Sequence, residues 1–476
     1  MITPSLRPLP IRAVCERRSR WGFALTPRSI ALLIAGFFFL IPGFWDQRLS
    51  YAMLAWEVLV LLAALLDGMR LPRASQLTAA RSWSNTPALD SETEIELTIE
   101  NSGSLILECL LTDDLPPALK IADARQAPVR VTAFPGVPAS IRYCVEPQER
   151  GDCTTGWLYI RYRSPLRLAE RWARAPLNQT VRVYPALRTG EEQEIFLARS
   201  RQIDTQLRQT RQRGLGRDFE SLREYRDGDD LRDICWTATA RRGNLITRQY
   251  QTERSQPVWI VMDCGRLMRS RVVSAPQASS YAATSSGRVH SKLDFACTSA
   301  VALAQLALFS GDRVGLLAYG QTIQQRLLPG RGAAHLRQLI ELLAQLRAES
   351  SEADHLHATA VLGRLQPRRS LILWITDLAE TAMRPEVIDG AMQLLRRHVL
   401  LFVAMAQPEV ESIANARPQN VEQMFRSAAA QEMAGRRELL LARLHEQGAL
   451  TLDLNPEALT SSVLNHYLTV KERAMV

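Results

Sequence analysis

Val258-Trp259-Ile260-Val261-Met262-Asp263 is an unbroken apolar run that ends in a carboxylate. Such a run is typical of a strand that is buried on both faces of a sheet. Beyond it, apolar strands alternate with helical stretches to the end of the chain. We expect strands at 313–319, 323–328 (an edge strand), 370–377, 398–405 and 449–454, and helices at 292–309, 333–347, 385–397, 421–447 and 456–471. The alternation predicts a doubly wound parallel α/β domain over residues 258–476, with residues 269–291 as a Ser/Ala-rich insertion.

The region before this domain has a different pattern. Between residues 74 and 185, short runs alternate apolar and polar side chains, and turn residues such as Asn101-Ser102-Gly103 separate them. The clearest runs are residues 94–99, 140–145, 156–161 and 180–184. Period-two alternation with turns at this spacing predicts an antiparallel, Ig-like β-sandwich. It contains no His, Ser or paired-acid constellation for catalysis, so we expect a spacer or a docking platform.

Two apolar runs near the N-terminus, Ser29–Trp45 and Leu49–Leu66, predict a transmembrane helical hairpin. A cleaved signal peptide is the alternative, but a small-residue cleavage site is missing and the second run does not fit one. Arginines before the first run and after the second place both flanks in the cytoplasm by the positive-inside rule. We therefore expect a multi-pass protein of the inner (cytoplasmic) membrane with cytoplasmic domains. No role is assigned to Glu57 within the second run.

Composition limits the remaining functions. The chain has 476 residues and a net charge of +9. Only three of the 58 basic residues are lysines, and no long basic run or basic-aromatic face follows the N-terminus, so we expect no nucleic-acid partner. The seven cysteines show no zinc spacing and are expected to be free thiols, although Cys144 and Cys153 could pair. Together the regions predict an α+β multidomain chain: a basic cytoplasmic tail (1–28), the hairpin (29–66), the sandwich (74–185), a connecting segment (186–257) and the α/β domain (258–476).

The connecting segment contains the densest cluster of charge, glycine and aromatic residues, GLGRDFESLREYRDGDDLRDICW at residues 214–236. Its glycines permit turns with positive φ. Its apolar residues are spaced so that one side of a folded loop could be buried, namely Phe219, Leu222, Tyr225, Ile234 and Trp236. A salt-bridged structural crossover and a partner-binding surface both fit this composition.

This segment, continued by Ala240–Gly243 and Leu245–Arg248, resembles the signature of the prokaryotic domain of unknown function 58 family. The resemblance extends to Arg150-Gly151, Ser164-Pro165-Leu166, Val183-Tyr184-Pro185, Lys292-Leu293-Asp294, residues 311–319 and Ile375-Thr376-Asp377. It implies a von Willebrand factor A (vWA)-like domain and a MoxR-type AAA+ ATPase as partner. The signature residues expected to bind that partner are Gly214, Gly216, Phe219, Arg223, Tyr225, Gly228, Asp229, Asp230, Arg232, Trp236 and Arg241.

The resemblance also implies where a metal would lie. A vWA module holds magnesium with Asp-x-Ser-x-Ser plus a Thr and an Asp from other loops, all hard oxygen ligands. Here the first strand continues as Asp263-Cys264-Gly265-Arg266-Leu267, so both serines are missing. Asp377 matches the late carboxylate, and Thr359 matches the threonine only loosely. We expect a degenerate site formed by Asp263 and Asp377, filled by the cation of Arg266, and no cofactor.

Two other clusters contain residue types that could bind a metal or support catalysis. Asp229, Asp230 and Glu253 could gather around a metal as a hydrolase, but neighbouring arginines, Arg223, Arg232 and Arg248, favour ion pairing. Asp354-His355-Leu356-His357 lacks further ligands at recognisable spacing and is expected to be a solvated helix start. The predicted function is a non-enzymatic, membrane-anchored cytoplasmic adaptor that works with a MoxR-type ATPase in the assembly or maturation of a client protein; the alternative is the hydrolase.

Overall fold

The structure is a computed structural model that describes residues 8–18, 23–39, 47–122, 128–186, 195–200, 202, 218–226, 231–251, 256–274, 288–378 and 386–473. The chain divides into two compact units, residues 1–186 and 187–476. Each unit is described by itself. Helices occur with both antiparallel and parallel sheets, so the predicted mixed class is confirmed.

The first unit contains two antiparallel sheets that share one apolar core. One sheet has the order β1 (Ile11–Val14), β4 (Leu77–Trp83), β5 (Thr93–Asn101), β9 (Ala139–Pro147) and β7 (Leu119–Ile121). The other has the order β2 (Glu16–Arg17), β12 (Ala169–Ala175), β11 (Leu158–Arg163), β6 (Leu107–Asp113) and β8 (Val129–Ala133), with β3 (Ala24–Leu25) also on β12. A separate ribbon pairs β10 (Gly151–Thr155) with β13 (Gln179–Val183). Buried and half-buried residues alternate along β4 and β5, as the period-two pattern predicts.

The N-terminal segment differs from the expected basic tail. Strand β1 pairs with β4, and both β2 and β3 pair with β12, so the segment adds strands to both sheets. Between β1 and β2, Cys15 is only 2% exposed and its N–H donates to the carbonyl of Leu77. The arginines of this segment alternate with small and apolar residues, and a half-buried edge strand accommodates that pattern because its outer face is solvated.

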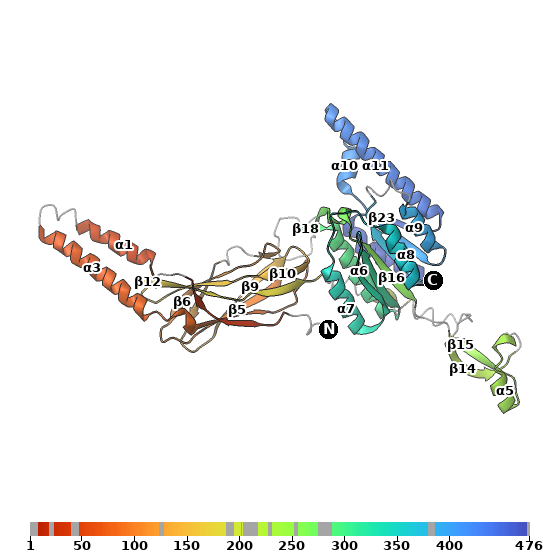
Figure 1. The fold of residues 1–476 in the computed structure, drawn as a ribbon, viewed down its shortest axis with the longest axis horizontal. Coiled ribbons are helices and arrows are strands. Elements are labelled where there is room, and N and C mark those ends of the chain that lie inside the picture. Colours follow the sequence, from red (N-terminus) through yellow and green to blue (C-terminus); the bar gives the residue numbers. More distant parts are fainter. Residues whose placement is uncertain are drawn as a thin grey trace. The chain divides into compact units, whose positions relative to one another are not determined.

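Two apolar helices extend from the first unit, α1 (Pro27–Gly36) and α3 (Gln47–Arg70), and Figure 1 shows them side by side. Thr26 caps α1 by accepting from the Ser29 N–H, and Pro27 occupies the first helical turn. The indole N–H of Trp56 donates to the Leu32 carbonyl at 2.9 Å. By length and composition, residues 51–70 of α3 are able to cross a membrane.

A buried ion pair lies between the sheets of the first unit. Arg81 on β4 is 0% exposed and pairs with Asp113 at the end of β6. Its guanidinium also donates to Thr155 Oγ1 at 2.7 Å and to the Leu177 carbonyl at 2.8 Å. The Tyr143 hydroxyl donates to the same carboxylate. The network therefore ties β4, β6, β9 and β10 together at one point.

The second unit is built on a six-stranded sheet of order β20-β19-β16-β21-β22-β23. Its strands are β20 (Ile323–Gly330), β19 (Arg313–Tyr319), β16 (Pro257–Asp263), β21 (Leu371–Thr376), β22 (Val399–Met405) and β23 (Leu450–Leu454). All pairings are parallel except that of β20, which is antiparallel to β19. The predicted strands and the predicted edge position of 323–328 are thus present.

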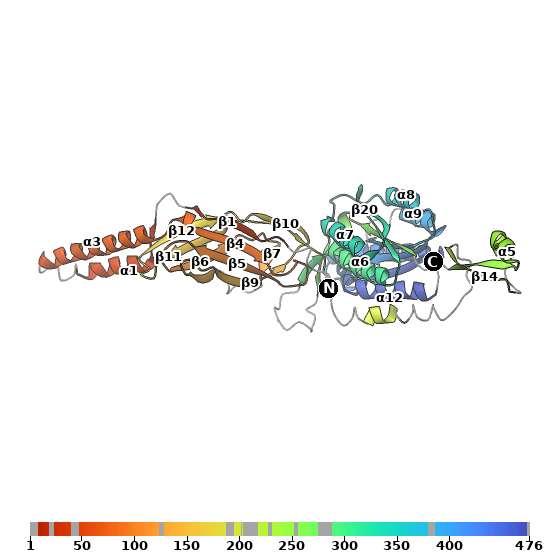
Figure 2. The same ribbon diagram turned by 90° about the horizontal axis from the view of Figure 1, so that it is seen from below.

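Helices flank this sheet on both sides: α6 (Lys292–Phe309), α7 (Gly332–Gln345), α8 (His355–Leu365), α9 (Glu386–Leu395), α10 (Pro408–Asn415), α11 (Val421–Glu446) and α12 (Leu459–Glu472). In Figure 2, α8 and α9 lie on one side of the sheet and α6 and α12 on the other. Helix α6 passes the length and apolarity test for a membrane span, but it is mostly buried, which identifies it as a core helix. Helix α10 was not among the predicted elements, and α8 was predicted only as a helix start at residues 354–357.

Residues 218–226 and 231–251 form a small module, which we call the signature module. Strand β14 (Asp218–Glu224) pairs with β15 (Ile246–Gln251), and η4 (Leu231–Asp233) and α5 (Trp236–Arg242) lie between them in the chain. Gly243 ends α5 in the left-handed conformation, φ 76°, which glycine adopts without strain. Within the predicted Ser/Ala-rich insertion, β17 (Arg271–Ser274) pairs antiparallel with β18 (Arg288–Ser291).

Candidate functional site

The carboxyl ends of β16 and β21 bring Asp263 and Asp377 to the same edge of the sheet. The two strands are adjacent and parallel, Asp263 ends β16, and Asp377 directly follows β21. Both carboxylates are buried, with exposures of 4% and 0%. Ligands commonly bind at this edge of a doubly wound sheet.

Asp263 is held by hydrogen bonds from neutral donors. Thr376 Oγ1 donates to one carboxylate oxygen at 2.6 Å, and the Gly265 N–H donates to the other at 2.7 Å. Burial disfavours the charged form and raises the pKa of Asp263 to about 6, against the smaller lowering effect of these two donors. Burial therefore favours the protonated form of the Asp263 carboxyl.

Asp377 is instead neutralised by internal cations. Lys292 Nζ, at the start of α6, lies 2.5 Å from Asp377 Oδ2 and is 2% exposed. Gln407 Nε2 donates to the same oxygen at 3.0 Å. Arg437 on α11 reaches Oδ1 at 3.6 Å and also pairs with Asp453 at 2.5 Å. Burial lowers the pKa of Lys292, and the Asp377 carboxylate opposes that shift.

The residues predicted to complete this site do not do so. Arg266 is about half exposed and lies 4.0 Å from Glu352, so the cation next to Asp377 is Lys292, not Arg266. Thr359 Oγ1 donates to the Leu356 carbonyl of its own helix at 3.0 Å. Lys292 and Thr376 belong to segments that resemble the family, but no local sequence pattern indicates that their side chains contact the carboxylates of Asp377 and Asp263. Gln407 and Arg437 come from distant elements and carry no sequence signal.

The surroundings of Asp263 do not fit the hydroxyl-rich magnesium set of a vWA module. A Cβ at Gly265 would lie 2.9 Å from the Ala353 backbone nitrogen, so this position has no room for a serine. Asp377 already contacts two cationic side chains. Among the residues that the structure describes, no cluster of three or more His, Cys, Asp or Glu side chains is arranged to hold a metal. Carboxylate and hydroxyl oxygens are what Mg²⁺ requires, and this edge offers few.

An aromatic hydrogen-bonded cluster lies in the same sheet. Trp374 Nε1 donates to the Tyr319 hydroxyl at 2.6 Å, and that hydroxyl lies 2.9 Å from His355 Nδ1. An indole N–H only donates, so the tyrosine hydroxyl is free to donate its own proton to Nδ1. His355 is 3% exposed, which corrects the expected solvated helix start. Asp354 does cap that helix, accepting from the His357 N–H at 2.8 Å.

The apolar residues of the signature module do not all lie on one buried side, as the sequence predicted. Ile234 is buried at 6% exposure, but Trp236 is 66% exposed and Leu222 39%. The physical reason is size: a two-stranded sheet with one short helix is too small to cover both of its faces. Arg223 Nη1 donates to the Glu224 carbonyl at 3.2 Å, Tyr225 is half-buried, and Arg241 is exposed in the last turn of α5.

Several predicted residues lie outside the described residues: Gly214, Gly216, Gly228, Asp229, Asp230 and Glu253. Phe219 and Arg232 belong to described elements, β14 and η4, but their side chains are outside the described part. The acid cluster of the hydrolase alternative therefore stays a hypothesis, as does the charge network of Asp229 and Asp230. All seven cysteines, including Cys144 and Cys153, are free.

Comparison with known proteins agrees with the signature. Residues 221–424 match the family model described as "Protein of unknown function DUF58". This part of the chain is thus similar to the DUF58 family. Uncharacterized proteins of Mycobacterium bovis and Mycobacterium tuberculosis are 25% identical to the chain over 199 residues, which are 41% of this chain and 56% of each relative. The chain thus spans about half the length of these curated relatives.

Two solved structures also match at low similarity. The conserved hypothetical protein BatB from Bacteroides thetaiotaomicron matches with a TM-score of 0.28 and 13% identity, over 46% of this chain and 98% of that chain. The ASH/PapD-like domain 7 of human CEP192 matches with a TM-score of 0.17 and 16% identity, over 21% of this chain and 79% of that chain.

Proposed function

We propose that this DUF58 protein is a membrane-anchored, non-enzymatic adaptor whose signature module docks a protein partner, by resemblance a MoxR-type AAA+ ATPase. In this proposal α1 and α3 form a hairpin in the inner membrane and both units lie in the cytoplasm. The first unit serves as an Ig-like sandwich platform, and the second as a vWA-like domain that works without a bound metal.

The observation that carries the docking proposal is the exposure of large apolar side chains on the signature module. Trp236 is 66% exposed, Leu231 67% and Leu245 44%, whereas the buried side chains among those that the structure describes in the module are Ile234, Cys235, Ile246 and Thr247. A two-stranded sheet with so small a core is marginal in water by itself. Exposed aromatic and aliphatic side chains of this size are typical of surfaces that a partner covers.

The sheet edge supports a non-enzymatic role. A general acid, base or metal ligand needs a polar group that can reach a substrate. Asp263 is occupied by Thr376 and Gly265, and Asp377 is occupied by Lys292 and Gln407. These contacts are those of a buried structural network, so we assign this edge to stability of the second unit.

Membrane anchoring is supported by the surface of α3. Most of its exposed side chains that the structure describes are large and apolar, among them Leu54, Val58, Leu59, Leu61, Leu62, Leu65 and Leu66. Burying this surface in lipid removes a large apolar area from water. Arginines lie at the start of α1 (Arg28) and at the end of α3 (Arg70), and by the positive-inside rule they support a cytoplasmic position for both ends.

The test is co-purification with the ATPase partner, together with thermal unfolding of each variant. We expect Trp236→Ala and Arg241→Glu to leave the melting temperature unchanged and to reduce the recovered partner by at least about tenfold, as for a buried aromatic anchor at an interface. Leu328→Ala, an equally exposed apolar residue on β20 at 58%, is the matched control and should retain full recovery. Full recovery of the partner by both module variants would contradict the docking proposal.

A further inference from the structure

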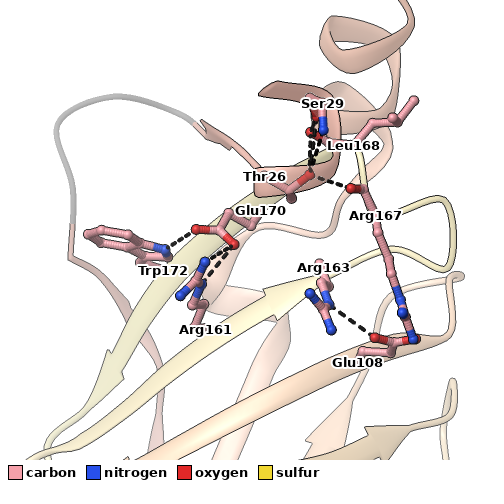
Figure 3. A network of polar contacts seen from close by, with 9 residues as sticks. All are labelled: Thr26, Ser29, Glu108, Arg161, Arg163, Arg167, Leu168, Glu170 and Trp172. Atoms are coloured by element: carbon pink, nitrogen blue, oxygen red, sulfur yellow. Dashed lines mark hydrogen bonds and ion pairs between the residues drawn. The ribbon is translucent and has the colours of Figure 1, made fainter. Parts of the chain in front are cut away.

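The turn between β11 and β12, Ser164–Leu168, is bonded to the start of α1. Figure 3 shows Thr26 and Ser29 at this contact, and both hydroxyls donate to backbone carbonyls of the turn, those of Arg167 and Leu168. Arg28 Nη1 donates to the Leu166 carbonyl at 3.1 Å. Ser164-Pro165-Leu166 is one of the segments that matched the family pattern, and the docking proposal gives it no role.

The same turn is bonded to the end of α3. Asp67, 3% exposed, accepts from Ser164 Oγ at 2.6 Å, from the Leu168 N–H at 3.2 Å and from the Ala169 N–H at 3.0 Å. Arg171 donates to the Gly68 carbonyl at 2.9 Å. Every one of these bonds is short-range and directional. The turn is therefore fixed at the level where the two apolar helices meet the sandwich.

The outer surface of this junction combines arginines with apolar side chains. Leu166, at the tip of the turn, is 56% exposed, and Trp172 on β12 is 42% exposed. The side chain of Arg167 is 47% exposed and that of Arg161 is 45% exposed. Long basic side chains, tryptophan and an aliphatic tip are the residue types that occupy the boundary between headgroups and acyl chains.

The charge balance at the junction is positive. Glu108 accepts from both Arg163, at 3.0 Å, and Arg167, at 2.6 Å, while Glu170 pairs with Arg161 at 2.7 Å. The hydrogen bond from Arg167 lowers the pKa of Glu108, so this carboxylate stays ionised and compensates only one of its two arginines. Arg28 and Arg70 add further positive charge at the helix ends.

We propose that this junction surface, formed by the Ser164–Leu168 turn with Arg28, Arg161, Arg163, Arg167 and Trp172, binds anionic phospholipid headgroups. The inference rests on the proposed membrane anchoring. The two helices fix the surface at the bilayer, the arginines meet phosphate groups, and Leu166 enters the acyl boundary. The sandwich is then held against the membrane surface by lipid as well as by its covalent link.

The experiment titrates the detergent-solubilised full chain with phosphatidylglycerol or phosphatidylcholine and measures bound lipid by native mass spectrometry. A basic residue near an anionic membrane contributes enough attraction that Arg28→Gln and Arg167→Gln should each weaken phosphatidylglycerol binding about fivefold. Arg182→Gln is the matched control, since Arg182 pairs with Asp152 on the β10–β13 ribbon. Figure 1 shows β10 at the end of the sandwich away from the helices. The control variant should bind lipid as the parent chain does.

Inorganic phosphate added as competitor separates a headgroup site from a simple phosphate site, because it should not displace the lipid that Leu166 also contacts. Equal affinity for the two lipids, or unchanged phosphatidylglycerol binding in both arginine variants with melting temperatures intact, overturns the proposal. Alkaline carbonate extraction of cell membranes tests anchoring separately. A chain that stays in the membrane pellet and shows no lipid preference rejects this inference alone, whereas a chain released by carbonate rejects the anchoring.

Discussion

Among the described residues, each unit contains a fully buried ion pair, Arg81–Asp113 in the first and Lys292–Asp377 in the second, and the two pairs differ in how completely their cations are bonded. Arg81 in the sandwich donates to a carboxylate, a hydroxyl and a carbonyl, and Tyr143 adds a further donor to Asp113. In the α/β unit, Lys292 Nζ, which has three protons to donate, has one described acceptor, Asp377. The sandwich pair is therefore a closed structural network, whereas the Asp377 carboxylate at the sheet edge is shared among Lys292, Gln407 and Arg437.

The largest effect is expected from Arg81→Met. It leaves Asp113 buried without a cation, which costs about 3–5 kcal/mol of unfolding free energy. Urea unfolding of the detergent-solubilised chain measures the change. Arg182→Met, which breaks an exposed pair with Asp152, is the control and should cost under about 1 kcal/mol. Similar losses of unfolding free energy in Arg81→Met and Arg182→Met would show that the buried network stabilises the fold no more than an exposed ion pair does.

Lys292→Met should cost less, about 2–3 kcal/mol, because Arg437 lies 3.6 Å from the same carboxylate and partly replaces the lost charge. The same unfolding experiment measures it. Arg266→Met is the control, since Arg266 is half exposed and distant substitutions of that kind stay within about 0.5 kcal/mol. A greater loss for Arg266→Met than for Lys292→Met would restore Arg266 as the cation of the site.

Asp263 gives the sheet edge a pH dependence. Burial raises its pKa to about 6 from the ordinary 3.8, so between these values the folded state holds more protons than the unfolded one. The contribution of Asp263 to stability is therefore fully present below about pH 4 and is lost as pH rises through about 6. In Asp263→Asn, Oδ1 still accepts from the Gly265 N–H and Nδ2 can donate to Thr376 Oγ1, so the variant should be more stable than the parent at pH 7 by about 1–3 kcal/mol, converging near pH 4. The same difference in unfolding free energy between Asp263→Asn and the parent at pH 7 and at pH 4 would contradict the raised pKa.

The smallest effect concerns magnesium. Because Gly265 has no room for a hydroxyl side chain and Asp377 contacts Lys292 and Arg437, millimolar Mg²⁺ should leave the melting temperature of the chain unchanged. A ligand that binds the native state would raise it. A saturable rise of several degrees that disappears in Asp263→Ala would reverse this conclusion and make the edge a metal site.

Local patterns predicted the sheet of the second unit, because apolar runs such as 258–263 and 371–376 are the direct consequence of burial on both faces. They could not predict Lys292, since it reaches Asp377 across 85 residues of chain. Trp236 was expected on a buried side of the segment but is exposed. A sequence pattern cannot distinguish an apolar residue that packs in a core from one that lies on the surface. At the N-terminus, arginine content concealed the edge strand Ile11–Val14.

The buried thiols have a consequence for kinetics. Burial raises the pKa of both Cys15 and Cys109, in the sandwich core, to about 12, so almost no reactive thiolate exists while that unit is closed. Cys264 and Cys297 are likewise 0% exposed in the second unit. An alkylating reagent can modify these positions only after the surrounding unit opens. The rate at which each cysteine is alkylated therefore reports how often its own unit opens. The opening of the two units can be measured independently in one native sample.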